Sequence, residues 1–199
     1  LIPPPNVFMV GERLMYELLG KISSSNAPIV FKGGLITKIV LEQNGFCDLQ
    51  RATVDIDANW IGSPPTMEFL TATLTAALGE LQDKYTLVPF REYGEKKSAG
   101  LNVLDKASGT KVISMDIEIN PIISSTIYHF GEISIKGVLA DEIIADKICA
   151  ISTDLIYKHR AKDLVDAYAL SQCIDVNVKK VLEVCKTKNR VLQSFDGLL

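Results

Sequence analysis

Two aspartates, Asp55 and Asp57, stand two residues apart in the segment TVDIDANW, a spacing that suits a metal-binding carboxylate pair. Apolar and polar side chains alternate from Thr53 to Ile61, which predicts a β-strand with both acids on one face, roughly 7 Å apart at Cα. Carboxylates this close repel each other unless a cation lies between them. Mg²⁺ takes one or two carboxylates and fills its shell with water and phosphate oxygens. The alternative is a solvent-facing strand with two hydrated acids.

A glycine pair precedes this strand. Residues 28–31 (PIVF) read as a short buried strand, Lys32-Gly33-Gly34 ends it, and residues 35–44 have a helical pattern. Glycine lets the backbone approach a ligand closely, and a helix N-terminus presents free N–H groups to phosphate. The order strand, glycines, helix, then Asp-x-Asp predicts a phosphate-binding turn beside a metal pair. A tight turn without a ligand is the alternative for the glycines alone.

A third acid often completes a site for phosphoryl transfer. Residues 112–120 (VISMDIEIN) alternate as a strand, with Asp116 and Glu118 on the polar face. Either acid could lie beside the first pair, and the residues leave the choice between them open. An ordinary amphipathic strand is an equal alternative.

Charged residues on two later helical segments are further candidates. Lys147 falls within the apolar stripe of the helix predicted over residues 139–151, so it must reach solvent or meet an anion. A nucleotide phosphate is one such anion, and a structural partner is the other. Asp163 and Asp166 lie three apart on the helix predicted over 161–173, near Arg160 and Lys162. Stabilisation of the helix N-terminus is their alternative role.

The order of elements predicts the α+β class, a mixed sheet flanked by helices with a helical C-terminal part. We expect one domain over residues 1–138 and a helical part over 139–199 packed on it. The 199 residues carry a net charge of −3, so no global basic field indicates nucleic-acid binding. The four cysteines form no CxxC pair, which predicts free buried thiols in a cytoplasmic protein. No apolar run has transmembrane length.

Together these segments resemble the AbiEii/AbiGii-toxin type of nucleotidyltransferase, a branch of the DNA polymerase β superfamily. The resemblance extends from about residue 30 to 170, and five short matches occur in the order of the family. The matching stretches are Phe31-Lys32-Gly33-Gly34, Arg51-Ala-Thr53-Val-Asp55-Ile-Asp57, Glu118-Ile-Asn120, Leu139–Lys147 ending in Ala-Asp-Lys, and Arg160-Ala-Lys162-Asp163-Leu-Val-Asp166.

The resemblance implies a nucleotidyltransferase fold and transfer of a nucleotide from a nucleoside triphosphate (NTP) to an acceptor. It further implies Mg²⁺ as cofactor, tRNA as one candidate acceptor, and a role as a toxin of a toxin–antitoxin or phage-defence system, with a cognate antitoxin as partner. The implied roles group by chemistry. Asp55 and Asp57 are expected to bind the metal, and Glu118 or Asp116 is expected to be the third acid. Lys147 and Asp163 are further catalytic candidates. The residues expected to bind the nucleotide are Lys32, Gly33, Gly34, Lys147, Arg160 and Lys162.

Two alternatives remain at this stage. The domain could bind nucleotide or a protein partner without turnover, because Leu35 follows the glycines where the family usually has a small hydroxyl residue. A metal-dependent glycosyltransferase also uses Asp-x-Asp. It usually needs a larger nucleotide-sugar domain ahead of that motif, and only about 50 residues precede the motif here.

Overall fold

A computed structural model describes residues 8–92, 98–119, 124–152, 160–187, 189 and 191. Helices and strands alternate in its first part, a run of strands follows, and three helices come last, as the α+β prediction required. They are α1 (Phe8–Ser24), β1 (Ile29–Lys32), α2 (Gly33–Gln43), β2 (Asp55–Trp60), α3 (Met67–Ala77), β3 (Tyr85–Arg91), β4 (Ser98–Asp105), β5 (Lys111–Glu118), β6 (Ser125–Phe130), β7 (Ile133–Val138), α4 (Ala140–Ile151), α5 (Ala161–Ser171) and α6 (Val178–Thr187). Short 3₁₀ turns lie at Cys47–Leu49 and Gly79–Asp83.

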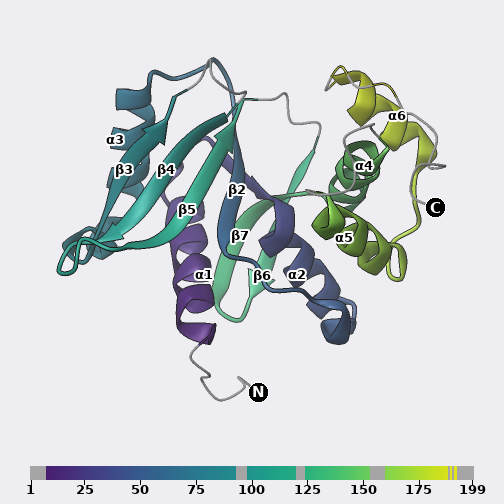
Figure 1. The fold of residues 1–199 in the computed structure, drawn as a ribbon, viewed down its shortest axis with the longest axis horizontal. Helices are drawn as coiled ribbons and strands as arrows, with labels where there is room; N and C mark the ends of the chain where they lie inside the picture. Colours follow the sequence, from purple (N-terminus) through teal and green to yellow (C-terminus); the bar gives the residue numbers. More distant parts are fainter. Residues whose placement is uncertain are drawn as a thin grey trace.

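Among the described residues, the strands form one seven-stranded sheet in the order β3-β4-β5-β2-β1-β7-β6 (Figure 1). The pairs β2/β5 and β1/β7 are parallel and the other neighbours are antiparallel, which makes the sheet mixed. β2, which carries both aspartates, is therefore the central strand. Its neighbours β1 and β5 bring the glycine turn and the candidate third acids to its two sides.

The alternating pattern of β5 explains how the sheet separates its core face from its polar face. Ile113, Met115 and Ile117 are buried, whereas Ser114, Asp116 and Glu118 between them are partly exposed. Burying a side chain of this size stabilises the fold by roughly 1.5 to 3 kcal/mol. A shift of one residue would turn the apolar set towards solvent, so the pattern fixes the register that places the acids.

The helices pack on this sheet in two groups. α1 lies against β7 and β1, and α3 lies against β3. α4 packs against both α5 and α6, and the three helices lie beside the sheet on the side away from α3 (Figure 1). α2 contacts β1 and β2 and also α4 and α5, so it links the sheet to the C-terminal helices. The division of the chain at residues 138 and 139 stays a prediction.

Three details differ from the sequence prediction. β6 was not predicted, because STIYHF has no regular alternation in its burial. α2 begins at Gly33 itself, so both glycines belong to its first turn. Cys149 of α4 and Cys185 of α6 are paired as a disulfide with Cα atoms 5.8 Å apart, so the expectation of free thiols was wrong for this pair. Spacing along the chain could not reveal a contact between two helices.

Within the described residues, no helix combines the length and the apolar character that crossing a bilayer requires.

Candidate active site

The aspartate pair lies on the polar face of β2, as the alternation predicted. Asp55 and Asp57 are partly exposed and Ile56 between them is fully buried. The ladder places Asp57 opposite Lys32 of β1 on one side and opposite Asp116 of β5 on the other. Adjacent strands lie roughly 4.8 Å apart, so these three charged residues form one row across the centre of the sheet.

The glycine turn lies directly against this row. Gly33 has φ +70°, and a β-carbon built there would lie 2.2 Å from Asp57 Oδ2. A β-carbon on Gly34 would lie 2.5 Å from the hydroxyl oxygen of Thr53. Position 33 therefore requires glycine for both conformation and space, and position 34 requires it for space. The first N–H groups of α2, which have no acceptor within the helix, consequently begin beside the Asp57 carboxylate.

The electrostatic surroundings of Asp57 favour a bound cation. Burial is the largest influence on its pKa and raises it, and the negative charge of Asp55 raises it further. The positive charges of Lys32, Lys147 and Lys162 act in the opposite direction, but the net pKa remains above the ordinary 3.8. A cation between the two aspartates would stabilise the charged form that burial disfavours.

A cavity of about 200 Å³ opens beside these groups, between the sheet and the C-terminal helices. It collects most of the predicted site residues, although they come from six different elements and from the residue that precedes α5. Those lining it are Lys32, Gly33, Asp57, Glu118, Lys147, Arg160, Lys162 and Asp163. Gly34, Asp55 and Asp116 do not line it.

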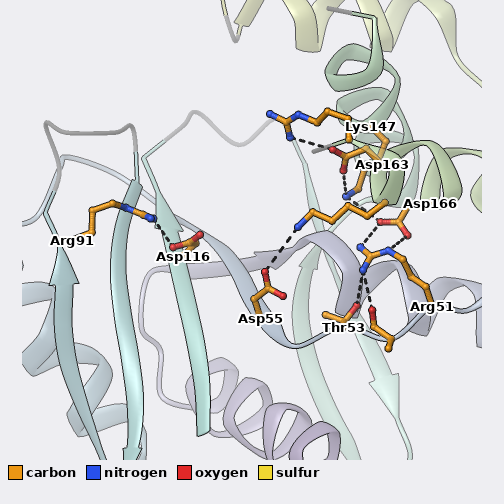
Figure 2. Close-up of polar contacts among 11 residues, drawn as sticks. Arg51, Thr53, Asp55, Arg91, Asp116, Lys147, Asp163 and Asp166 are labelled. Atoms are coloured by element: carbon orange, nitrogen blue, oxygen red, sulfur yellow. Dashed lines mark hydrogen bonds and ion pairs between the residues drawn. The ribbon is translucent and has the colours of Figure 1, made fainter. Parts of the chain in front are cut away.

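Lys147 and the acids of α5 form a buried ion network (Figure 2). Lys147 Nζ lies 2.7 Å from Asp163 Oδ1 and 3.1 Å from Asp166 Oδ2, and its side chain is 10% exposed. Arg160 donates to the other oxygen of Asp163 at 3.1 Å. Burial lowers the pKa of Lys147, but the two carboxylates more than compensate, so the pKa is raised and the amine stays charged. The structural partner foreseen as an alternative for Lys147 is thus present, at the wall of the cavity.

Arg51 joins this network to the sheet and was not among the predicted site residues. Its Nε and Nη2 donate to the two oxygens of Asp166 at 2.7 and 2.8 Å, a bidentate pair that fastens the start of β2 to α5 (Figure 2). Asp166 is nearly fully buried. An arginine four residues before Asp55 was a visible signal, but only folding shows that it faces Asp166.

The two candidate third acids have different partners. Asp116 Oδ1 accepts a hydrogen bond of 2.5 Å from Arg91 Nη2, and Arg91 was likewise not predicted. Glu118 Oε2 accepts one of 2.5 Å from Lys32 Nζ. Asp116 is the direct neighbour of Asp57, whereas Glu118 lies opposite Asn59 and reaches the cavity. Asn120 of the same motif lies outside the described residues.

The residues that could hold a metal are thus the two aspartates of β2. Lys162 Nζ is 4.0 Å from Asp55 Oδ2, the longest of the ion pairs around the site. Within the described part of the chain, no group of three or more His, Cys, Asp or Glu side chains is arranged as a metal site. Two carboxylates with hard oxygen atoms beside a phosphate-binding turn still suit Mg²⁺, which draws its other ligands from water and phosphate.

Comparison with protein families decides between the alternatives. Residues 13–194 match the family described as nucleotidyl transferase AbiEii toxin, type IV toxin–antitoxin system. The chain belongs to this family. The AbiEii match makes it a nucleotidyltransferase, and it does not support the glycosyltransferase alternative. A comparison with curated proteins gives no significant match.

Solved structures share the fold of this AbiEii-family chain at low identity. JHP933 from Helicobacter pylori has 16% identity and a TM-score of 0.55, over 93% of this chain and 74% of that one. The nucleotidyltransferase toxin MenT4 from Mycobacterium tuberculosis has 17% identity and a TM-score of 0.56, over 92% and 67%. The antibiotic-resistance factor ANT(2'')-Ia has 14% identity and a TM-score of 0.56, over 91% and 92%. These likenesses confirm the nucleotidyltransferase fold.

Proposed function

We propose that this AbiEii-family protein is a magnesium-dependent nucleotidyltransferase that transfers a nucleoside monophosphate from an NTP to an RNA acceptor such as tRNA. The observation that carries the proposal is the contact between Asp57 and Gly33. This contact sets a carboxylate pair against the first turn of a helix, where the carboxylate oxygens would bind the metal and the helix N–H groups would donate to the phosphates that the metal holds.

The bound metal would neutralise the triphosphate charge and the charge that develops at the α-phosphate. Asp55 and Asp57 are the residues that would hold it. Gly33 and Gly34 would offer backbone N–H groups to the phosphates, because neither carries a side chain that blocks the approach. Catalysis would then come mainly from positioning the NTP and the acceptor hydroxyl in line.

Positive side chains support the same arrangement. Lys32, Arg160 and Lys162 line the cavity, and Lys147 raises the positive potential at Asp57 from the far wall. We propose that these groups attract and hold the triphosphate. Asp163, which is buried between Lys147 and Arg160, would keep both cations in place.

The acceptor and the biological role rest on the family. The family description names a toxin of a type IV toxin–antitoxin system, and MenT4 is described as a nucleotidyltransferase toxin. We propose that this chain acts as such a toxin, that an antitoxin encoded with it limits its activity, and that it modifies tRNA. Expression alone should then slow bacterial growth, and the growth defect should require Asp57.

A transfer assay tests the proposal directly. The protein is incubated with Mg²⁺, total tRNA and each of four α-labelled NTPs, and label on the RNA is measured. Asp57→Ala should abolish labelling, and Asp83→Ala, which removes an exposed aspartate in the turn Gly79–Asp83, should not. Labelling that persists at the wild-type level in Asp57→Ala, with an unchanged melting curve, would contradict the proposal.

A wild-type protein that binds Mg²⁺–NTP tightly but labels no RNA would contradict tRNA as acceptor. Repeating the assay with protein and small-molecule hydroxyl acceptors would then separate another acceptor from a domain that binds without turnover.

A further inference from the structure

Asn59 has a buried polar atom without a partner. It lies on β2 two residues beyond Asp57, on the same face, and is 7% exposed. Its side-chain oxygen Oδ1 is inaccessible and has no hydrogen-bond partner among the residues that the structure describes. An unpaired buried polar atom destabilises the fold, so a folded protein seldom keeps one without a use.

Asn59 also lines the cavity of the candidate active site. Part of the wall of this cavity is apolar and comes from β7, α4 and α6. Val138, Ile143, Ala150 and Val184 line it, each of them buried, together with Thr187. An apolar wall with a few polar groups fits a flat heteroaromatic ring better than it fits phosphate.

The cavity offers charged and apolar groups to one ligand. Gly33, Asp57 and the lysines suit the triphosphate and its metal, and the apolar part of the wall suits the nucleoside. Asn59 lies two residues from Asp57 along β2 and lines the same cavity. A nucleotide with its phosphates at Gly33 and Asp57 would therefore bring its nucleoside part within reach of Asn59.

We propose that the Asn59 side chain turns towards the cavity when nucleotide binds, that its Oδ1 then accepts a hydrogen bond from the nucleoside part of the donor NTP, and that Asn59 is a residue that determines nucleotide specificity. The proposal rests on the nucleotidyltransferase function proposed above. The group it recognises is an N–H or O–H donor, which is either an amino or imino N–H on the base edge or a ribose hydroxyl. A nucleotide lacking that donor would leave the buried oxygen unpaired and would bind more weakly.

The test compares the nucleotide affinities of Asn59→Leu and the wild type. Each protein is titrated calorimetrically with the Mg²⁺ complexes of ATP, CTP, GTP and UTP. Leucine has a similar size and no polar atom. Asn102→Leu is the matched control, since Asn102 is an amide of β4 outside the cavity, where its Oδ1 accepts a hydrogen bond from Ser114. Mg²⁺ alone and Mg²⁺ with tripolyphosphate probe the metal and phosphate end without a nucleoside.

We expect Asn59→Leu to bind at least one Mg²⁺–NTP about tenfold more weakly, and Asn102→Leu to bind like the wild type. Tripolyphosphate should bind both variants equally. The melting temperature of Asn59→Leu should be unchanged or higher, because the substitution removes an unpaired polar atom; a purely structural amide would give a lower one. If Asn59→Leu loses affinity only for nucleotides with certain bases, the donor is a base N–H. If it loses affinity equally for all four nucleotides, and this difference from the wild type disappears with deoxyribose analogues, the donor is a ribose hydroxyl.

Three outcomes would overturn the inference. Unchanged affinity of Asn59→Leu for all four NTPs would show that Asn59 does not contact the nucleoside. If Asn59→Leu loses as much affinity for Mg²⁺–tripolyphosphate or for Mg²⁺ alone as for the NTPs, Asn59 acts on the phosphates or the metal and not on the nucleoside. A wild type that binds no NTP would overturn the proposed function as well, and this result is distinct from the first two.

Discussion

Gly33 and Asp57 approach each other so closely that a β-carbon on Gly33 would lie 2.2 Å from Asp57 Oδ2. Gly33→Ala must therefore displace the carboxylate or the start of α2. We expect it to lower the free energy of unfolding by more than the roughly 1 to 2 kcal/mol of a left-handed alanine, and to abolish Mg²⁺–NTP binding. Urea denaturation and calorimetric titration measure the two effects.

Gly45→Ala is the control for backbone strain. Gly45 also has positive φ, +81°, but a β-carbon there has no atom within 4 Å. In Gly45→Ala the free energy of unfolding should fall only by the cost of a left-handed alanine, and nucleotide binding should be normal. If the two variants behave alike, contact with Asp57 is not what requires glycine at position 33.

Arg51 should contribute strongly to stability through Asp166. Its removal in Arg51→Ala leaves a buried carboxylate with Lys147 as its remaining cation, and we expect a loss of roughly 2 to 4 kcal/mol in the free energy of unfolding. Arg13→Ala breaks an exposed pair with Glu17 and should cost less than about 0.5 kcal/mol. Chemical denaturation of both variants gives the comparison, and similar losses would show that the Arg51 pair is no stronger than a surface pair.

The two candidate third acids should give different kinetic losses. Asp116 is the direct cross-strand neighbour of Asp57, so Asp116→Asn should lower kcat by roughly 100-fold or more. Glu118 lies one pleat further on, paired with Lys32, so Glu118→Gln should mainly raise KM for the NTP. Steady-state labelling kinetics separate the two parameters. The reverse result would assign the third acid to Glu118.

Without a divalent cation, Asp57 should destabilise the folded protein at neutral pH. Its pKa is raised by folding, so its favourable contribution is complete below the unfolded value near 3.8 and is lost as the pH rises through the folded pKa. Asp57→Asn should therefore be more stable than the wild type in EDTA at pH 7.5. The difference should shrink as the pH is lowered.

Mg²⁺ should reverse this order by stabilising only the wild type. Thermal denaturation with EDTA or with Mg²⁺ provides the measurement. A variant that is less stable than the wild type in EDTA would show that burial does not disfavour the Asp57 carboxylate.

The sequence by itself determined the α+β class, the strand that carries Asp55 and Asp57, the glycine turn before it and the family. These features depend on local spacing: side chains alternate along a strand, and glycine is needed where a β-carbon cannot fit. Two aspartates two apart share a face in any strand, so no tertiary information was needed to pair them.

Tertiary structure alone decided how distant charges meet. Arg51 and Asp166 are 115 positions apart and bind each other because α5 packs against α2, which in turn packs on β2. The same packing turns Lys147 towards Asp163 and brings residues of α4 and α6 to the cavity that Asn59 lines. Whether a charge is paired and whether a polar oxygen is buried depend on which groups surround it in space. The residue type and its position in the sequence do not show this.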